Sequence, residues 1–405
     1  MGFEILASPI NIGRRTALNR LVNHPMECND ADSSGNPTEL TLKRYRRLAE
    51  GGAGMINLES LTVSPVSRAR KNQLEITERT AEGLAKLVKA MREVNDKPLI
   101  IFQINHSGNV SNRNFSNVVS YYPIGDTSVH LLSDEEIDEI MQWFVKAAVI
   151  AHQVGADGID FKQCHGYLGG QLLRPANTRE GRFGGSFENR TRFFRETAER
   201  IKQEITDDTF ILGSRISYYE GIIGGFGTAG PDEVAEDPTE PLAFVKMIEA
   251  TGFHFINVSS GIPALTPEII RPTKSFPEGV YRHFGWAKAV KGAVKIPIIG
   301  SGYSYLRNGK NKLGGDDTSK KSLLYWAEKN IKDGHVHMVG VGRQSLADPL
   351  FAKKVLAGNF DDIKYCTVCS ECSVLLVSQA RVGCTIYDKF YKEEVRRVKN
   401  AQNER

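Results

Sequence analysis

The sequence lacks the features that would place it in a membrane or on nucleic acid. No apolar run approaches the roughly 18 residues of a membrane-spanning helix, and the first residues hold no basic segment followed by an apolar one. The net charge of the 405-residue chain is only +4, which favours neither nucleic acid nor an anionic membrane as a partner. We therefore expect a cytoplasmic protein of ordinary globular composition.

Cysteine is also scarce, and its distribution is uneven. Cys28 and Cys164 stand alone, whereas the other four follow the spacing Cys-x2-Cys-x2-Cys-x11-Cys near the end of the chain: Cys366, Cys369, Cys372 and Cys384. In a cytoplasmic protein such a cluster indicates a metal site rather than disulfides. Four thiolates at this spacing bind a [4Fe–4S] cluster or structural zinc, and the spacing alone does not decide between them.

Short apolar runs recur along most of the chain. They are continuous rather than alternating, which is typical of parallel strands buried on both faces. We expect eight strands, within residues 20–26, 52–61, 98–105, 156–163, 210–217, 253–260, 295–302 and 335–342.

Amphipathic helices are expected between these runs. The clearest covers 133–153, where Ser133 and Glu136 form a capping box; 83–94 and 188–205 show similar patterns. Eight repeats of strand and helix predict an α/β fold, a (β/α)8 TIM barrel over residues 1–360 with a short cysteine-rich extension over 361–405. An open doubly wound sheet is the alternative.

Chemistry in such a barrel gathers at the carboxyl ends of the strands. Polar or titratable residues stand at these predicted ends, most densely in the run Lys162 to Tyr167. The long segments 106–132, 217–240 and 260–278 follow three strand ends, and we expect them to form walls over the site.

The last two strand ends predict a phosphate site. Gly302 and Gly342 allow backbone N–H groups to approach an anion, and Arg343 adds a forked cation. Gln103 and Arg215 lie on inner strands, where an amide and a buried cation suit a ligand that accumulates negative charge. Together these residues suggest flavin mononucleotide (FMN) across the barrel mouth; a salt bridge at the barrel rim is the alternative explanation for Arg215.

Several longer motifs resemble the Old Yellow Enzyme family of FMN-dependent oxidoreductases. They are "ASPINIG" with "LNRLVNHPM" at the start, "QINHSG" (103–108), "HGYLGGQLLRPANTREGRFGGSFENR" (165–190), "SRIS" (214–217) and "GVGRQSLADP" (340–349). They occur in family order from about residue 5 to 358. The resemblance implies a barrel, bound FMN and NAD(P)H as a reductant.

The resemblance also implies which residues hold the flavin. They are Pro25, Met26, Glu27, Ser60, Gln103, Arg215, Gly302, Gly342 and Arg343. Glu27 is a departure, since the family often has Thr or Cys there. An ionised carboxylate near the ring disfavours reduced anionic flavin unless a cation pairs with it.

The same resemblance implies which residues act on the substrate. Lys162 and His165 occupy the places of the two residues that polarise a substrate carbonyl, often two histidines or histidine and asparagine. Tyr167 matches the tyrosine that protonates the α-carbon. Lys162 is unusual; it could pair with Glu27 or recognise a substrate carboxylate. We expect His106 to be structural and Cys164 to pack away from the site.

The cysteine quartet resembles that of two related groups, the dienoyl-CoA reductases and the trimethylamine-dehydrogenase-like enzymes. There it ligates [4Fe–4S] and feeds the FMN. Those enzymes continue into further domains, whereas 21 residues follow Cys384 here. We expect these residues to form a polar, frayed helix and electrons to pass to or from a separate partner protein; with zinc instead, NAD(P)H would reduce the flavin directly.

Three functions remain open on the sequence. The leading one is reduction of an activated C=C bond of a small molecule. The second is an amine dehydrogenase or demethylase that sends electrons out through the cluster. The third is a barrel subunit kept for electron transfer or assembly. Homo-oligomers are common in the family, but no sequence feature marks an interface.

Overall fold

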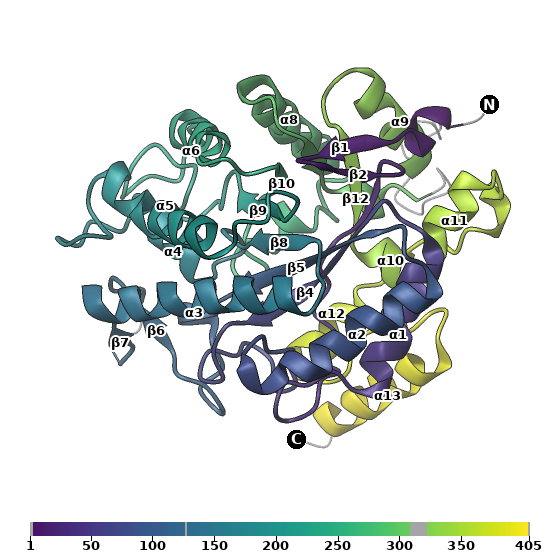
Figure 1. Cartoon of the computed structure of the whole chain (residues 1–405), viewed down its shortest axis with the longest axis horizontal. Helices are drawn as coiled ribbons and strands as arrows, with labels where there is room; N and C mark the ends of the chain where they lie inside the picture. Colours follow the sequence, from purple (N-terminus) through teal and green to yellow (C-terminus); the bar gives the residue numbers. More distant parts are fainter. Residues whose placement is uncertain (1–2, 126–127, 308–321, 404–405) are drawn as a thin grey trace.

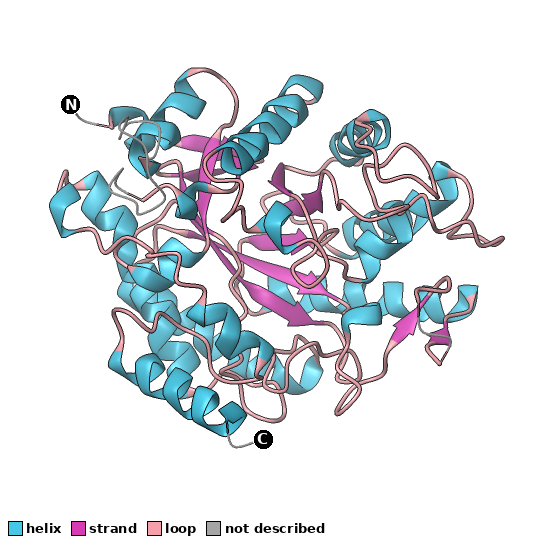
Figure 2. Ribbon diagram, turned by 180° about the vertical axis from the view of Figure 1, so that it is seen from behind, coloured by secondary structure: helices cyan, strands magenta, loops and turns pink. Residues whose placement is uncertain are grey.

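A closed barrel of eight parallel strands forms the centre of the protein. The computed structural model describes residues 3–125, 128–307 and 322–403. The strands follow the order β10-β11-β12-β3-β4-β5-β8-β9 around the barrel, and Figure 2 shows them enclosed by helices. Their bounds are β3 Leu21–Asn23, β4 Met55–Thr62, β5 Leu99–Asn105, β8 Gly158–Phe161, β9 Ile211–Ser217, β10 Phe255–Ser259, β11 Ile298–Gly300 and β12 Met338–Val341.

All eight predicted strands are therefore confirmed, and the alternative of an open sheet is excluded. Each lies inside or within one residue of its predicted range, although β3 and β11 keep only three residues each. The strands are buried along their whole length, as the continuous apolar runs required.

The helices surround the barrel in chain order (Figure 1). They are α1 Glu39–Gly51, α2 Ala81–Val94, α3 Asp134–Gln153, α4 Leu168–Leu173, α5 Phe187–Glu204, α6 Thr239–Ala250, α7 Pro267–Ile270, α8 Glu278–Ala293, α9 Leu323–Lys332, α10 Arg343–Ala347, α11 Phe351–Leu356, α12 Glu371–Val377 and α13 Lys389–Asn403. The capping box of α3 is confirmed, since the Ser133 side chain accepts a hydrogen bond from the Glu136 N–H. Among the described helices, none is long and apolar enough to cross a bilayer.

A hairpin covers the amino-terminal end of the barrel. Its strands are β1 Ile10–Ile12 and β2 Arg15–Ala17. Ile12 and Ala17 are fully buried against inward-facing barrel residues such as Met55 and Phe255. Side chains therefore fill the barrel interior at this end. A second small sheet, β6 Val119–Ser120 with β7 His130–Leu131, lies outside the barrel.

The carboxyl-terminal extension packs against the barrel beside α1, and Figure 1 shows α12 and α13 on that side. Tyr391 and Val395 of α13 are buried in a small core with Cys28, Leu375 and Val382. The predicted helix is confirmed, but the prediction that it is frayed was wrong. Tyr391 and Val395 are four residues apart and so share one face of the helix, which docks it.

Candidate active site

A cavity of about 230 Å³ opens at the carboxyl end of the barrel. Eleven of the twelve predicted flavin and catalytic residues line it: Pro25, Met26, Glu27, Gln103, Lys162, His165, Tyr167, Arg215, Gly302, Gly342 and Arg343. The twelfth, Ser60, does not line the cavity but contacts it through Lys162. The structure therefore brings together residues that span more than 300 positions of sequence.

One side of the cavity carries a buried cation with open donors. The Nε and Nη1 groups of Arg215 have no hydrogen-bond partner among the described residues, and Nη2 lies 3.5 Å from Ser301 Oγ. Asp160 instead accepts from the Arg215 backbone N–H at 2.6 Å and from Gln103 Nε2 at 2.8 Å. The guanidinium thus forms no ion pair within the described chain, which leaves its donors for a ligand.

Another part of the lining has the features of an anion site. Gly302 has a φ of 95°, and a Cβ added at Gly342 would lie 2.9 Å from Met26 Sδ, so neither position suits a larger residue. Arg343, the first residue of α10, stacks over Tyr305 and donates to its hydroxyl, while its Nη1 is free of partners within the described residues. The glycines leave space for a phosphate, and Arg343 supplies a positive charge that can bind it.

Glu27 is the centre of a tight group of side chains. Its Oε2 lies 3.0 Å from Arg70 Nε, and its Oε1 accepts from the Tyr167 hydroxyl at 2.5 Å and from Lys162 Nζ at 3.5 Å. Burial would raise the pKa of Glu27, but Arg70, Lys162 and the phenol outweigh it and lower that pKa to about 2. The carboxylate is therefore ionised, and both of its oxygens are occupied.

Lys162 and Tyr167 are held against each other as well. Lys162 Nζ lies 3.4 Å from the centre of the Tyr167 ring and donates to Ser60 Oγ at 3.0 Å. Burial lowers the pKa of Lys162, against the opposing effect of Glu27. Burial and the Glu27 charge raise the pKa of Tyr167, so the phenol keeps its proton.

His165 occupies a strained position at the same strand end. Its φ of 64° is left-handed, which is uncommon for a residue other than glycine and marks a constrained site. Its Nε2 lies 2.8 Å from Ser259 Oγ. Burial, together with the nearby charges of Arg215 and Lys162, lowers its pKa well below the usual range, so the ring is neutral.

Some residues of the cavity were missed from the sequence. Arg70 lies in the loop after β4, and Arg271 follows α7 and donates to Ser373 Oγ at 3.0 Å. Neither loop has a periodic pattern that marks the side chain. Of the three long segments predicted as walls, only 260–278 contributes described residues to the lining; 106–132 and 217–240 do not. The predicted structural role of His106 is supported, since it accepts from the Gly108 N–H and stacks on Trp143.

The four clustered cysteines share a small cavity next to this site. Cys366, Cys369, Cys372 and Cys384 line a space of about 20 Å³ together with Arg343. Cys372 and Arg343 also line the larger cavity. In the described ranges, no group of three or more His, Cys, Asp or Glu side chains is arranged to hold a metal ion. The four thiols therefore face one space, but the predicted metal site is not confirmed.

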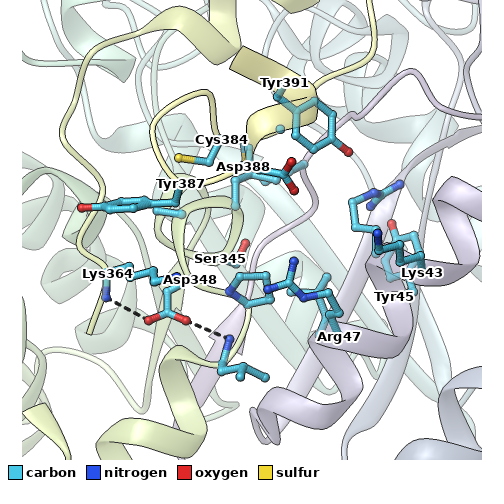
Figure 3. A pocket seen from close by; sticks show the side chains of 18 of the residues that line it. Lys43, Tyr45, Arg47, Ser345, Asp348, Lys364, Cys384, Tyr387, Asp388 and Tyr391 are labelled. Atoms are coloured by element: carbon cyan, nitrogen blue, oxygen red, sulfur yellow. Dashed lines mark hydrogen bonds between the residues drawn. The ribbon is translucent and has the colours of Figure 1, made fainter. Parts of the chain in front are cut away.

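A second large cavity, of about 240 Å³, lies outside the barrel. Figure 3 shows Tyr391, Asp388 and Cys384 on one side of it and Lys43, Tyr45 and Arg47 on the other. Its walls come from α1, α10 and the segment before α13. Met26, predicted to hold the flavin, and Cys384 of the quartet line it, whereas Lys162, His165 and Tyr167 do not.

Comparison with known proteins agrees with this arrangement. The chain is 31% identical over 396 residues to an NADH oxidase of Thermoanaerobacter brockii, covering 95% of this chain and 56% of that protein. It is 28% identical over 358 residues to an NADPH dehydrogenase of Bacillus subtilis (strain 168), covering 86% and 93%. A dimethylamine dehydrogenase of Hyphomicrobium sp. (strain x) is 27% identical over 387 residues, 91% of this chain and 48% of the relative. The chain thus spans about half the length of two of these relatives, the NADH oxidase and the dimethylamine dehydrogenase.

Solved structures agree in fold. A 2-naphthoyl-CoA reductase in complex with 2-naphthoyl-CoA matches with a TM-score of 0.80 at 24% identity, over 96% of this chain and 58% of that one. A morphinone reductase in complex with tetrahydroNAD matches with a TM-score of 0.65 at 19% identity, over 87% and 90%. Residues 5–362 match a single sequence family. By that match, the chain belongs to the NADH:flavin oxidoreductase / NADH oxidase family.

Proposed function

We propose that the protein is an FMN-dependent oxidoreductase that reduces an activated C=C bond, with electrons from NAD(P)H or a separate redox partner. The observation that carries the proposal is the convergence of two groups of residues on one cavity. Arg215, Gln103 and Arg343 lie in the same lining as Lys162, His165 and Tyr167. A flavin site without a substrate acid, or an acid without a flavin site, would not support this function.

The unpartnered donors fit bound FMN. In this proposal Gln103 would bind the pyrimidine part of the flavin and Arg215 would stabilise negative charge on the reduced ring. The phosphate would be held by Gly302, Gly342 and Arg343, and the ring would be bordered by Pro25, Met26 and Ser60. The open Nε and Nη1 of Arg215 support this assignment, because a buried guanidinium needs partners. When bound, FMN supplies the hydride.

The substrate groups act on the other reactant. His165 is neutral and donates a hydrogen bond to the substrate carbonyl, where negative charge develops during the reaction. The Lys162 ammonium has three N–H donors, of which Ser60 and Glu27 use two, so one remains for the same oxygen. Tyr167 keeps its proton at neutral pH and delivers it to the α-carbon.

The residue type and spacing of the four cysteines suit a centre with soft thiolate ligands, although their side chains are not arranged around a metal ion in the described structure. All four face one cavity, and Val368 and Ser370 between them adopt left-handed backbone angles, with φ of 56° and 62°. We propose a [4Fe–4S] cluster ahead of zinc, because Cys372 lies in the wall of the flavin cavity and a redox centre there can exchange electrons with the flavin.

The amine dehydrogenase alternative is less favoured by the geometry. It requires an anion for the cationic substrate, and among the described lining residues the carboxylate is Glu27. Both oxygens of Glu27 already bind Arg70, Lys162 and Tyr167. A cation entering the cavity would also meet Lys162, Arg215 and Arg271, which repel it.

The test compares substrates and one variant. Protein purified without oxygen and loaded with FMN is reduced and mixed with a panel of enones, and the oxidised protein is mixed with N-methylated amines. We expect enones to reoxidise the flavin and Y167F to slow this reaction by about 100-fold or more while NAD(P)H still reduces the flavin. Flavin reduction by amines alone would contradict the proposal, and so would undiminished enone turnover in Y167F. An iron assay on the same protein decides between iron–sulfur and zinc.

A further inference from the structure

Glu27 stands between two proton-bearing groups of the site. Its Oε1 is shared by the Tyr167 hydroxyl, at 2.5 Å, and by the Lys162 ammonium, at 3.5 Å. Its other oxygen is fixed by Arg70 at 3.0 Å. The side chains of Glu27 and Lys162 are nearly closed to solvent, with exposed fractions of 11% and 4%. The carboxylate therefore connects the phenol and the ammonium through one oxygen atom.

This contact creates a difficulty for the acid step. When Tyr167 gives up its proton, a tyrosinate is left 2.5 Å from an ionised carboxylate. Two negative charges at that separation in a buried site repel strongly. A tyrosine acid in this protein therefore needs a proton to replace the one it has lost before the next substrate can react.

We propose that Glu27 is a proton-relay and positioning residue that passes a proton from Lys162 to Tyr167 after each turnover. This inference rests on the proposed function, in which Tyr167 is the acid. The geometry offers one route, from Nζ to Oε1 and from Oε1 to the phenolic oxygen. Lys162 lies over the ring of Tyr167, and its bond to Ser60 holds it there.

The proton balance closes over one cycle. The O–H bond of Tyr167 breaks as the C–H bond at the substrate α-carbon forms, and the electron pair stays on the phenolic oxygen. An N–H bond of Lys162 then breaks, and its proton reaches that oxygen through Glu27 Oε1. Lys162 is left as a neutral amine and regains a proton from solvent; the reduced flavin supplies the two electrons of the overall reduction.

The energetics favour this direction of transfer. Burial lowers the pKa of Lys162, whereas burial and Glu27 raise the pKa of Tyr167. The two groups have similar pKa values in water, so in this site the ammonium is the stronger acid. Tyrosinate beside Lys162 ammonium is therefore the less stable arrangement, and the proton moves from the lysine to the tyrosine.

The test separates the first turnover from later ones. FMN-loaded protein, reduced anaerobically, is mixed with an enone from the panel above in a stopped-flow instrument. The key variant is E27Q, whose amide oxygen still accepts from the phenol but cannot carry a proton. We expect its first turnover to be slowed far less than its later ones, because Tyr167 starts with its own proton; any change in flavin binding caused by the substitution slows both alike.

Later turnovers should behave differently. With the relay broken, steady-state turnover of E27Q should fall by about 100-fold, and the ultraviolet absorbance of tyrosinate should appear after the first turnover. E27D, which can still carry a proton, should recover most of the steady-state rate. E240Q is the matched control, since Glu240 is an arginine-paired carboxylate outside the cavity, and it should behave as wild type.

The outcomes distinguish a failure of the proton relay from a failure of the proposed function on which it rests. Equal slowing of first and later turnovers in E27Q, without tyrosinate, would overturn the relay while leaving Tyr167 as the acid. A fast first turnover in Y167F would instead overturn the proposed function. If E27Q does not fold, E27M serves in its place, since methionine has a similar length and neither accepts nor donates a proton at neutral pH; the same two readouts then decide.

Discussion

Two buried glutamates, Glu27 and Glu59, lie in neighbouring parts of the protein and differ in their pKa values. Glu27 faces the flavin cavity and contacts two cations, Arg70 and Lys162. Glu59, on β4, shares a single cation, Arg44, with a second carboxylate, Asp30. The pKa of Glu27 falls to about 2, whereas that of Glu59 rises to about 7. Both are buried and both bind an arginine, so burial and pairing alone do not explain the difference.

The ratio of cations to carboxylates explains it. Burial opposes ionisation of both groups. At Glu27 two cations act on one carboxylate and overcome that cost. At Glu59 the attraction of Arg44 is divided, and the charge of Asp30 repels the second anion. The two sites are also linked, because the Cys28 N–H, next to Glu27 in the chain, donates to Glu59 Oε2 at 3.1 Å.

The largest effect should come from removing the shared cation. R44M leaves Asp30 and Glu59 buried without a positive partner, and breaking a buried ion pair on one side costs roughly 3–5 kcal/mol. Urea unfolding at neutral pH measures the change. R46M, two residues along the same helix at an exposed position, should change stability by less than about 0.5 kcal/mol. Equal losses in the two variants would contradict the account of Arg44.

An intermediate effect should appear in the pH dependence of stability. Ionised Glu27 stabilises the fold above its ordinary pKa of 4.5, and this contribution is lost as the pH falls toward about 2. Glu59 has the opposite sign: the folded state holds its proton more tightly, so stability falls as the pH rises from 4.5 to about 7. Shifts of this size correspond to at most roughly 3 kcal/mol.

Two variants test which glutamate causes each part of the pH dependence of stability. E27Q should flatten the acid side of the stability curve, and E59Q should flatten the decline toward neutral pH. Unfolding free energies measured across the range in which each protein folds provide the comparison. A curve for E59Q that keeps the wild-type slope would show that Glu59 does not titrate there.

The smallest effect should come from R70K, which keeps the positive charge beside Glu27 and changes the shape of the side chain that carries it. The ratio of cations to carboxylates at Glu27 stays the same, so its pKa should remain low and stability should change by less than about 1 kcal/mol. R70M is the contrasting variant, because it removes one cation and should raise the pKa of Glu27. Carboxyl titration by NMR distinguishes them; a raised pKa in R70K would mean that geometry, not charge, sets it.

The fold could be predicted from the sequence because its signals are local and repeated. Each buried parallel strand leaves a continuous apolar run, as in the residues of β5, and Ser133 with Glu136 marks the start of α3. The docking of α13 was missed, because two apolar residues in a polar helix give a weak signal until the surface beneath them is known.

The residues of the candidate site also differ in how well the sequence predicts them. Residues at strand ends, such as Gln103 and Arg215, could be placed because the barrel fixes where strands end. Arg70 and Arg271 come from loops, where sequence spacing does not determine spatial position. The protonation of Glu27 could not be predicted without Arg70, because it depends on counting the charges around it.

The contact between Arg271 and Ser373 has a consequence for how the cofactor is retained. Arg271 belongs to the barrel and Ser373 to the extension, and Cys372, Leu376 and Val382 of the extension line the flavin cavity. The extension therefore forms part of the wall of the cavity in which we propose that FMN binds. Because FMN bound there would be enclosed partly by the extension, we expect R271M, which removes the hydrogen bond to Ser373, to shorten the residence time of FMN on the protein.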